Sequence, residues 1–236
     1  MLNPYERSAQ VYDLYYSWLD YETHAITIHE QIEERKPGAT SLLELGCGTG
    51  RYMEQLGQWY EIEGLDISES MLTVAHRRLP DAVLHLDDMT DFDLGRSYDA
   101  IACLFSSIAY VTSLADLGAV IRCSAQHLNS GGVLIIEPWF TPDVWEEGHV
   151  DARVVEGDGL KVARVGSSEV VGNRAIMRWA WAVAWEDGDA DAYVEEHPTG
   201  LFTIGEYDTL LRQAGLMPGY NPAGPLGRGL HIAVKR

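Results

Sequence analysis

Acidic residues follow short apolar segments at three places in the first half of the chain. Glu44 lies in the segment Leu42–Gly50, in which three glycines alternate with other residues. Asp66 closes the segment Glu61–Asp66, and Asp88 follows a third apolar stretch. A carboxylate at the end of a parallel strand can accept hydrogen bonds from ribose hydroxyls, and glycines let the chain turn tightly beside a ligand. This series predicts a binding site for a small nucleoside-like cofactor.

The glycine spacing indicates which cofactor. Gly46, Gly48 and Gly50 give the pattern E-x-G-x-G-x-G, whereas the dinucleotide fingerprint is G-x-G-x-x-G with a pyrophosphate at the helix N-terminus. An acidic residue before the turn would be awkward beside a pyrophosphate, but it is tolerable beside the zwitterionic end of S-adenosylmethionine (SAM). The run resembles motif I of the class I methyltransferases, which use SAM. An ordinary strand–helix turn is the alternative, and the two acidic segments that follow argue against it.

This resemblance implies roles for individual residues. Asp66 would accept both ribose hydroxyls, Asp88 would bind the adenine amino group, and Met89 would pack against the adenine ring. For Asp87 and Asp88 taken alone, a solvated turn is the alternative. The residues expected to bind SAM in these segments are Glu44, Gly46, Gly48, Gly50, Asp66, Ile67, Asp88 and Met89.

Composition limits the class of protein. The 236 residues, 46% of them hydrophobic, suffice for one α/β domain with an insertion. No apolar run approaches the roughly twenty residues of a membrane span, and the N-terminus has no secretory pattern. The three cysteines Cys47, Cys103 and Cys123 form no CxxC or Cys/His cluster. We therefore expect a cytoplasmic protein with no membrane partner, no disulfide framework and no metal site.

The charge disfavours one class of partner. The formal net charge is −19, and the arginines are scattered rather than gathered in a basic run. Such a chain repels nucleic acid, so we expect a small-molecule substrate and no nucleic-acid partner. The same acidity would oppose an anionic substrate unless arginines converge at the site.

Strand and helix signals alternate through the first 138 residues and return at the end of the chain. Apolar segments predict strands over 42–44, 61–66, 82–86, 97–105, 132–138 and 230–234. Helices are expected over about 11–18, 23–35, 51–58, 69–78, 113–128 and 205–214, with Asn129-Ser-Gly-Gly ending the fifth. The alternation predicts an α/β fold with a doubly wound, mostly parallel sheet, and the resemblance to the class I methyltransferases implies that this sheet has seven strands. Its ligands should bind over the carboxyl ends of the strands, where Ser106 and Glu137 also fall.

The apolar spacing changes to two between about 150 and 203. Met177, Trp179, Trp181, Val183 and Trp185 share one face of a predicted strand, and alanines occupy the other face. We therefore divide the chain into a SAM-binding domain, 1–138 with 201–236, and an inserted antiparallel β layer, 139–200. The tryptophan face is either the hydrophobic side of a packed or dimerising sheet or an aromatic wall of the substrate pocket.

Several motifs carry a narrower resemblance over nearly the whole chain. They are Tyr12–Tyr16, the motif I run, Phe105–Ile108, Glu137–Trp139 and Gly227–Leu230. Together they resemble the N,N-dimethyltransferases that finish TDP-linked aminosugars such as desosamine and mycaminose. The resemblance implies that the insertion forms the far wall of the active site and helps to form a homodimer.

The narrower resemblance also implies roles around the methyl acceptor. Tyr21 and Leu104 would join the SAM site, and Tyr16, Ser107 and Tyr110 would form the catalytic group. A guanidinium is a planar, bidentate donor for phosphate oxygens. The residues expected to bind substrate are Tyr16, Trp139, Arg153, Arg164 and Arg228, with Arg228 on the phosphate. Alternatively, Arg228 pairs with a carboxylate and Tyr16 is a packing aromatic.

Position 110 departs from the resembled family, which has His where this chain has Tyr. Tyrosine, with a pKa near 10, is a poor base at neutral pH. Tyr110 could instead hold the amine by a hydrogen bond, since orientation alone can supply roughly 7–11 kcal/mol. It could equally mark a different acceptor. His127, His149 and His197 are candidate bases by residue type only, and His197 is the most plausible of them.

These features favour a SAM-dependent N-methyltransferase of a small amine, most plausibly a nucleotide-linked aminosugar that is dimethylated. The alternative is N- or O-methylation of another natural product or of a peptide amine. A SAM-binding scaffold without activity is a third interpretation, and the glycine spacing disfavours an NAD-dependent enzyme. Failure of Arg153, Arg164, Arg178 and Arg228 to converge would favour an uncharged or cationic acceptor.

Overall fold

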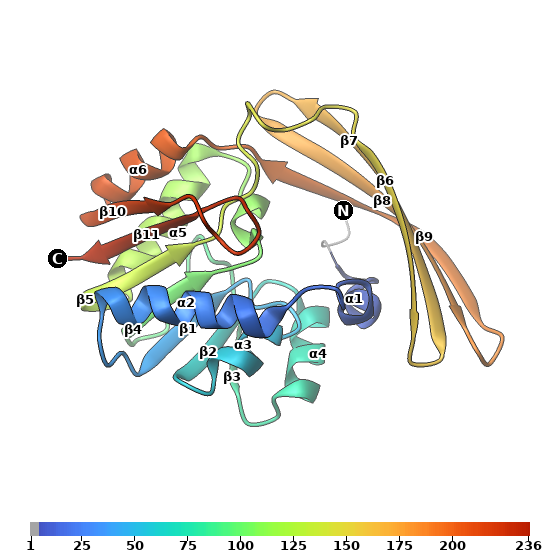
Figure 1. Ribbon diagram of the computed structural model, residues 1–236, viewed down its shortest axis with the longest axis horizontal. Helices are drawn as coiled ribbons and strands as arrows, with labels where there is room; N and C mark the ends of the chain where they lie inside the picture. Colours follow the sequence, from blue (N-terminus) through green and yellow to red (C-terminus); the bar gives the residue numbers. More distant parts are fainter. Residues whose placement is uncertain (1–4) are drawn as a thin grey trace.

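The computed structural model describes residues 5–236, which form two separate β-sheets (Figure 1). The first has seven strands in the order β10-β11-β5-β4-β1-β2-β3. Only β11 runs antiparallel to its neighbours. Its strands are β1 (Ser41–Leu45), β2 (Glu61–Asp66), β3 (Val83–Leu86), β4 (Tyr98–Cys103), β5 (Leu128–Ile136), β10 (Leu216–Asn221) and β11 (Leu230–Lys235). The predicted doubly wound, mostly parallel sheet is confirmed.

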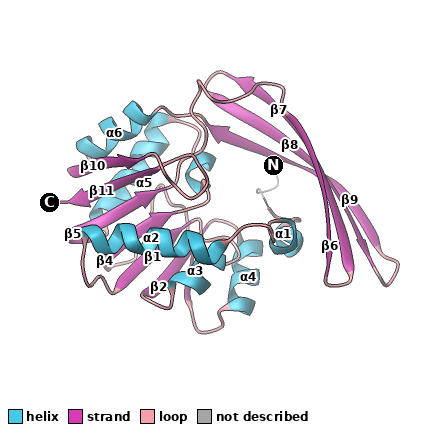
Figure 2. Ribbon diagram, in the orientation of Figure 1, coloured by secondary structure: helices cyan, strands magenta, loops and turns pink. Residues whose placement is uncertain are grey.

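Helices cover both faces of this sheet (Figure 2). Apolar side chains of α2 (Tyr21–Arg35) and α3 (Arg51–Leu56) pack on one face, and α4 (Glu69–Arg78) packs beside α3. On the other face lie α5 (Leu114–Gln126) and α6 (Ile204–Gln213). Four of the five begin at a side chain that accepts a backbone N–H, the residues being Asp20, Ser68, Ser113 and Thr203. The exception is α3, which begins at Gly50.

The sheet differs from the sequence prediction at two strands. β5 begins at Leu128, so the predicted helix terminator Asn129-Ser-Gly-Gly lies inside a strand whose pairing with β4 is irregular. β10 was not predicted because Pro218 and Gly219 interrupt its apolar pattern. An edge strand tolerates proline because one side of it needs no partner.

The second sheet contains four antiparallel strands in sequence order. They are β6 (Val150–Gly157), β7 (Leu160–Val171), β8 (Arg174–Trp185) and β9 (Ala190–Gly200). As predicted, one face of β8 is buried at alternate residues and the alanine face is exposed. The buried face packs against the short helix α1 (Ala9–Tyr15) of the same chain, with the rings of Tyr15 and Trp181 5.0 Å apart.

Helix α1 lies between the two sheets and contacts β6 of the second sheet and α4, which packs on the first (Figure 1). On the side of the second sheet, the Ser8 hydroxyl donates to Glu195 over 2.7 Å. On the other side, Asp13 accepts hydrogen bonds from Thr49 in the glycine turn and from Arg78 in α4. The helix therefore positions the second sheet over the carboxyl ends of the parallel strands.

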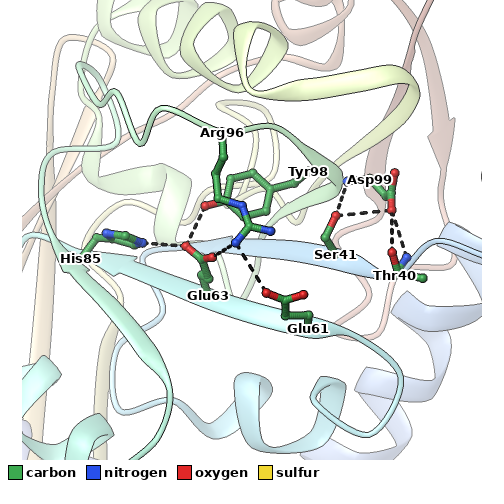
Figure 3. A network of polar contacts seen from close by, with 8 residues as sticks. All are labelled: Thr40, Ser41, Glu61, Glu63, His85, Arg96, Tyr98 and Asp99. Carbon is green, nitrogen blue, oxygen red and sulfur yellow. Dashed lines mark hydrogen bonds and ion pairs between the residues drawn. The ribbon is translucent and has the colours of Figure 1, made fainter.

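Figure 3 shows a polar network around Glu63 in β2. Buried Glu63 accepts hydrogen bonds from Tyr98 and Arg96 and contacts His85 at 2.8 Å. Burial would raise the pKa of Glu63, but these partners outweigh it and hold the pKa below its usual range. The network joins β2, β3 and β4 without reaching any residue expected to bind a ligand. No helix in residues 5–236 is long and apolar enough to cross a membrane.

Candidate active site

The turn after β1 is held in place by the carboxylate that ends β2. The Asp66 carboxylate accepts the backbone N–H of Gly48 and that of Ser68, each at 2.8 Å. Burial raises the pKa of Asp66, and these N–H donors partly oppose the shift. The acidic residue thus shapes the glycine turn and also faces the space above it.

Gly46 is required by its surroundings. Its φ of +65° is in the left-handed region, and a Cβ at this position would lie 2.6 Å from the Cβ of Ser107. The Ser107 hydroxyl donates to the Gly46 carbonyl oxygen over 3.1 Å. This close approach brings the end of β4 against the glycine turn.

Two cavities adjoin this turn. The larger has a volume of about 520 Å³, and its lining includes Gly46, Gly48, Asp66, Ile67, Asp88, Met89, Ser107 and Tyr110. The smaller is lined by Tyr21, Glu44, Leu104 and the turn. Nine of the ten residues predicted to bind the cofactor therefore line one cavity or the other. The exception is Gly50, which precedes α3 and packs against Ala75.

Glu44 is a buried carboxylate at the smaller cavity. Its Oε2 has no hydrogen-bond partner among the described residues, and the side chain is almost fully buried. Burial raises the pKa of Glu44 well above its usual range, and nearby Asp66 raises it further. An orphan buried oxygen carries a free-energy penalty that a cationic ligand group would relieve.

A third cavity, of about 570 Å³, lies between the parallel-sheet edge and the inner face of the second sheet. We call it the acceptor cavity. Nine aromatic residues line it, namely Tyr5, Tyr16, Trp18, Phe105, Tyr110, Trp139, Phe140, Trp145 and Trp179. Tyr16, Trp139, Arg164 and Arg228 line it as expected, but Ser107 does not, because its hydroxyl turns toward Gly46 on the cofactor side. Both interpretations of the tryptophan face hold in part, since Trp179 lines the cavity and Trp181 packs on α1.

The four arginines named from the sequence do not all converge. Arg178 lies on the outer face of β8 and pairs with Glu169 and Glu196. Arg153 is directly opposite Arg164 in the sheet, but it belongs to the exposed edge strand and does not line the cavity; it stacks on Trp18 at the rim. Only Arg164 and Arg228 line the acceptor cavity.

The two cavity arginines differ in charge compensation. Arg164 pairs with Asp151 at 2.9 Å, donates to the Tyr16 hydroxyl, and lies against the ring of Trp179. Arg228 has no carboxylate within ion-pair distance among the described residues. Its Nε donates to the carbonyl oxygen of Pro138, and its guanidinium lies 5.0 Å from the ring centre of Trp139. Burial lowers the pKa of Arg228, and Glu137 and Tyr52 oppose the shift.

The loop around Arg228 explains the Gly-Arg-Gly sequence. Gly229 has a φ of +77°, and a Cβ there would lie 2.3 Å from the Tyr220 hydroxyl. That hydroxyl in turn donates to the Arg228 carbonyl oxygen over 3.2 Å. The glycine lets the loop fold closely against β10, which directs Arg228 toward the end of β5.

The larger cofactor-side cavity and the acceptor cavity meet at shared residues. Tyr5, Phe105 and Tyr110 line both. Phe105 and Ser106 have φ values of +49° and +60°, which non-glycine residues rarely adopt. The strained pair is fixed because Phe105 donates its N–H to Glu137 and the Ser106 hydroxyl donates to the Pro138 carbonyl, both over 2.7 Å. Ligands in the two cavities would meet at this junction.

Tyr110 belongs to a chain of polar groups behind the junction. Its hydroxyl hydrogen bonds to the Tyr5 hydroxyl and to Nδ1 of His197, the latter at 3.0 Å. On the other side of the imidazole ring, Nε2 of His197 lies 3.5 Å from Glu195. Burial raises the pKa of Tyr110 well above its usual range and lowers that of His197, although Glu195 opposes the second shift. At neutral pH the tyrosine is a phenol and the histidine is uncharged.

Sequence reasoning missed three features of this site. Tyr5 and Phe105 were not singled out, because only the packing of α1 and of the β4 end brings them to the junction. The pairing of His197 with Tyr110 was also missed. A signal was available, since the period of two in β9 places Glu195 and His197 on the same face as Tyr193.

Comparisons with known proteins agree with this geometry. Residues 42–132 match the family model of a methyltransferase domain. The dTDP-3-amino-3,4,6-trideoxy-alpha-D-glucopyranose N,N-dimethyltransferase of Streptomyces venezuelae is 41% identical, over 96% of this chain and 97% of its own.

Solved structures show the same fold. Streptomyces venezuelae DesVI superposes with a TM-score of 0.92 at 41% identity, over 97% of this chain and 98% of its own. SAM-bound CalS10, an amino pentose methyltransferase from Micromonospora echinaspora, has a TM-score of 0.86 at 33% identity, over 96% and 97% of the two chains. The chain belongs to the class I methyltransferases, in the family of the TDP-aminosugar N,N-dimethyltransferases.

Proposed function

We propose that this protein transfers methyl groups from SAM to the amino group of a TDP-linked aminosugar, twice per sugar. Arg228 is the observation that carries the proposal. It is a part-buried guanidinium without a carboxylate partner among the described residues, at the wall of an aromatic cavity. In a chain of net charge −19, such a cation is suited to an anionic ligand group. The relatives named above act on sugars of this class.

The cofactor-side residues fit SAM. The orphan oxygen of Glu44 suits the ammonium of the methionine end, and Asp66 faces the cavity that would hold the ribose. We assign Asp88 and Met89, which line the same cavity, to the adenine. When bound, SAM supplies a methyl group activated by its sulfonium. The protein then has to align a neutral amine with that methyl group at the junction and exclude water.

We assign the acceptor to the other cavity. Tyr16 and Trp139 would contact the sugar, and Arg228 would bind a phosphate oxygen. Arg164 is neutralised by Asp151 and would hold Tyr16 in place rather than bind phosphate. Under this assignment, residues 139–200 provide the far wall of the acceptor site and the rest of the chain provides the SAM site.

A panel of acceptors tests the proposal. The protein is incubated with SAM and, in separate reactions, with dTDP-3-amino sugars, dTDP-4-amino sugars, the free aminosugars and unrelated amines. The masses of the products are measured by mass spectrometry. We expect one and then two methyl groups on nucleotide-linked sugars only. Equal methylation of a free aminosugar would refute the role of the phosphates. Methylation of only unrelated amines or hydroxyls would establish the alternative function.

We also infer a homodimer formed through the outer face of the second sheet. The tryptophan face is covered by α1 of the same chain, whereas the outer face exposes Val154, Val165 and Val194 beside the alanines of β8. Sedimentation at several concentrations tests this inference. A Val194→Glu variant that sediments like the parent would exclude this face.

A further inference from the structure

We propose that His197 removes the proton of the substrate amine through Tyr110, which transfers it across one hydroxyl. The inference rests on the proposed amine substrate and adds a route for the proton. Tyr110 touches both cavities and is the catalytic residue of this scheme. His197 is completely buried behind it and acts as the positioning residue and final proton acceptor.

The reaction requires such a route twice. A sugar amine is largely protonated near neutral pH, and a protonated amine has no lone pair to attack a methyl group. The first transfer leaves a protonated methylamine, which must lose a proton before the second transfer. The three residues that line both cavities, Tyr5, Phe105 and Tyr110, offer only the two tyrosine hydroxyls as acceptors of these protons.

The surroundings of His197 bear on which ring nitrogen carries the hydrogen. Glu195 lies 3.5 Å from Nε2, an ion-pair distance at which Nε2 has no hydrogen-bond partner among the described residues, and we place the hydrogen on Nε2, toward this carboxylate. Nδ1 is then an acceptor, and the hydroxyl 3.0 Å away, that of Tyr110, must donate to it. Under this assignment the single hydroxyl hydrogen of Tyr110 points to His197, so Tyr5 becomes the donor in the hydrogen bond between the two tyrosine hydroxyls, and the remaining lone pair of Tyr110 is free for the amine proton.

Glu195 is itself held as an anion. Burial would raise its pKa, but His197 and the hydroxyl and N–H of Ser8 outweigh this effect and lower it. The groups facing the imidazole are Glu195 on β9, Tyr110 in the short 3-10 helix η1 (Ser107–Tyr110), Tyr5 before α1 and Trp179 on β8, with Arg164 on β7 as the nearby cation. Glu195 can stabilise an imidazolium, which Arg164 opposes.

The proton balance is simple. The amine N–H bond breaks toward Tyr110 Oη as the Tyr110 O–H bond breaks toward Nδ1 of His197, so the tyrosine ends as a phenol. The freed lone pair forms the N–C bond while the S–C bond breaks and its electron pair stays on sulfur. The imidazolium returns its proton to solvent after the product leaves. Tyr110 thus passes the proton on without becoming a tyrosinate. Its raised pKa opposes such an ionisation, and the relay does not require one.

A His197→Gln variant tests the proposal on whichever amine the parent protein methylates. At neutral pH we expect kcat to fall about 100-fold, the low end for general acid–base catalysis, with little change in KM for SAM. The loss should shrink toward high pH, where the amine is already neutral. Tyr110→Phe should show the same fall in kcat and the same pH dependence, and the kcat of the double variant should be no lower than that of either single variant. Parent activity on nucleotide sugars tests the proposed function separately.

A control and a second readout separate this role from a structural one. His127→Gln changes another buried histidine, one that accepts the Leu94 N–H far from the cavities, and should keep the parent pH profile. NMR of isotope-labelled histidine in the free protein should show His197 neutral with hydrogen on Nε2. A kcat loss that is the same at all pH values, or hydrogen on Nδ1, would overturn the proposal. Should His197→Gln not fold, Tyr110→Phe and the NMR tautomer still decide it.

Discussion

The cofactor edge and the acceptor cavity are built in different ways. At the cofactor edge, backbone groups of one turn and the carboxylate that ends the neighbouring strand make most of the site, as the bond from Gly48 to Asp66 shows. The acceptor cavity is made of side chains from the segments on either side of α1, from the ends of β4 and β5, from the second sheet and from the loop before β11. A site built from the main chain of one turn leaves a short contiguous motif in the sequence. A site built from side chains of distant segments leaves no such motif.

This difference explains what the sequence could predict. The parallel sheet follows from apolar runs and glycine turns, and nine of the ten residues predicted to bind the cofactor line the two cavities beside the glycine turn. On the acceptor side, the sequence shows that aromatic residues are present. Which of them line one cavity depends on where α1 lies between the two sheets. Tyr5 and the pairing of Tyr110 with His197 depend on contacts between residues about 90 to 105 positions apart.

The largest expected effect would come from the cofactor edge. Asp66→Ala removes the acceptor of two backbone N–H groups and of the proposed ribose bonds. We expect SAM to bind at least about 100-fold more weakly by calorimetry, since a hydrogen bond to a charged group contributes about 1.5–3 kcal/mol. Asp81→Ala, at an exposed position outside the cavities, is the matched control. Unchanged SAM affinity in the Asp66 variant would refute the assignment of this edge as the SAM site, and with it the contrast drawn between the two regions.

The acceptor side should respond to Arg228→Ala without a matching change at the cofactor edge. We expect KM for a nucleotide sugar to rise about 30-fold, because a charge-assisted bidentate contact is lost. KM for SAM should change by less than about threefold. Arg153→Ala, at the rim, should change both constants little. Equal effects on the two substrates would mean that Arg228 supports the whole site and does not bind phosphate.

A variant outside both regions sharpens the comparison. Glu63→Gln should lower the free energy of unfolding by about 1.5 kcal/mol, because Arg96 and His85 lose a buried anionic partner. The folded-state pKa of Glu63 is depressed, so its contribution is present above the unfolded pKa near 4.3 and disappears as pH falls through the folded value. The difference in denaturant midpoint between variant and parent should therefore narrow below about pH 4. A change in kcat or KM of the Glu63→Gln variant would show that the Glu63 network influences the active site.

The smallest expected effect is that of Arg178→Ala. Its side chain pairs with Glu169 and Glu196 on the outer face of the second sheet and reaches neither cavity. Steady-state constants for both substrates should match those of the parent within about twofold, as is usual for exposed pairs. A selective rise in acceptor KM would show that the outer face influences the acceptor side.

The position of α1 sets a rule for exchanging parts between relatives. Ser8 and Tyr15 contact the second sheet, while Asp13 bonds to the glycine turn and to α4. A graft of residues 139–200 alone would place a foreign sheet on a helix shaped for another surface. A redesign of acceptor specificity should therefore exchange the N-terminal helix together with the inserted strands. The two parts must be exchanged jointly even though most of the SAM-binding sequence lies between them.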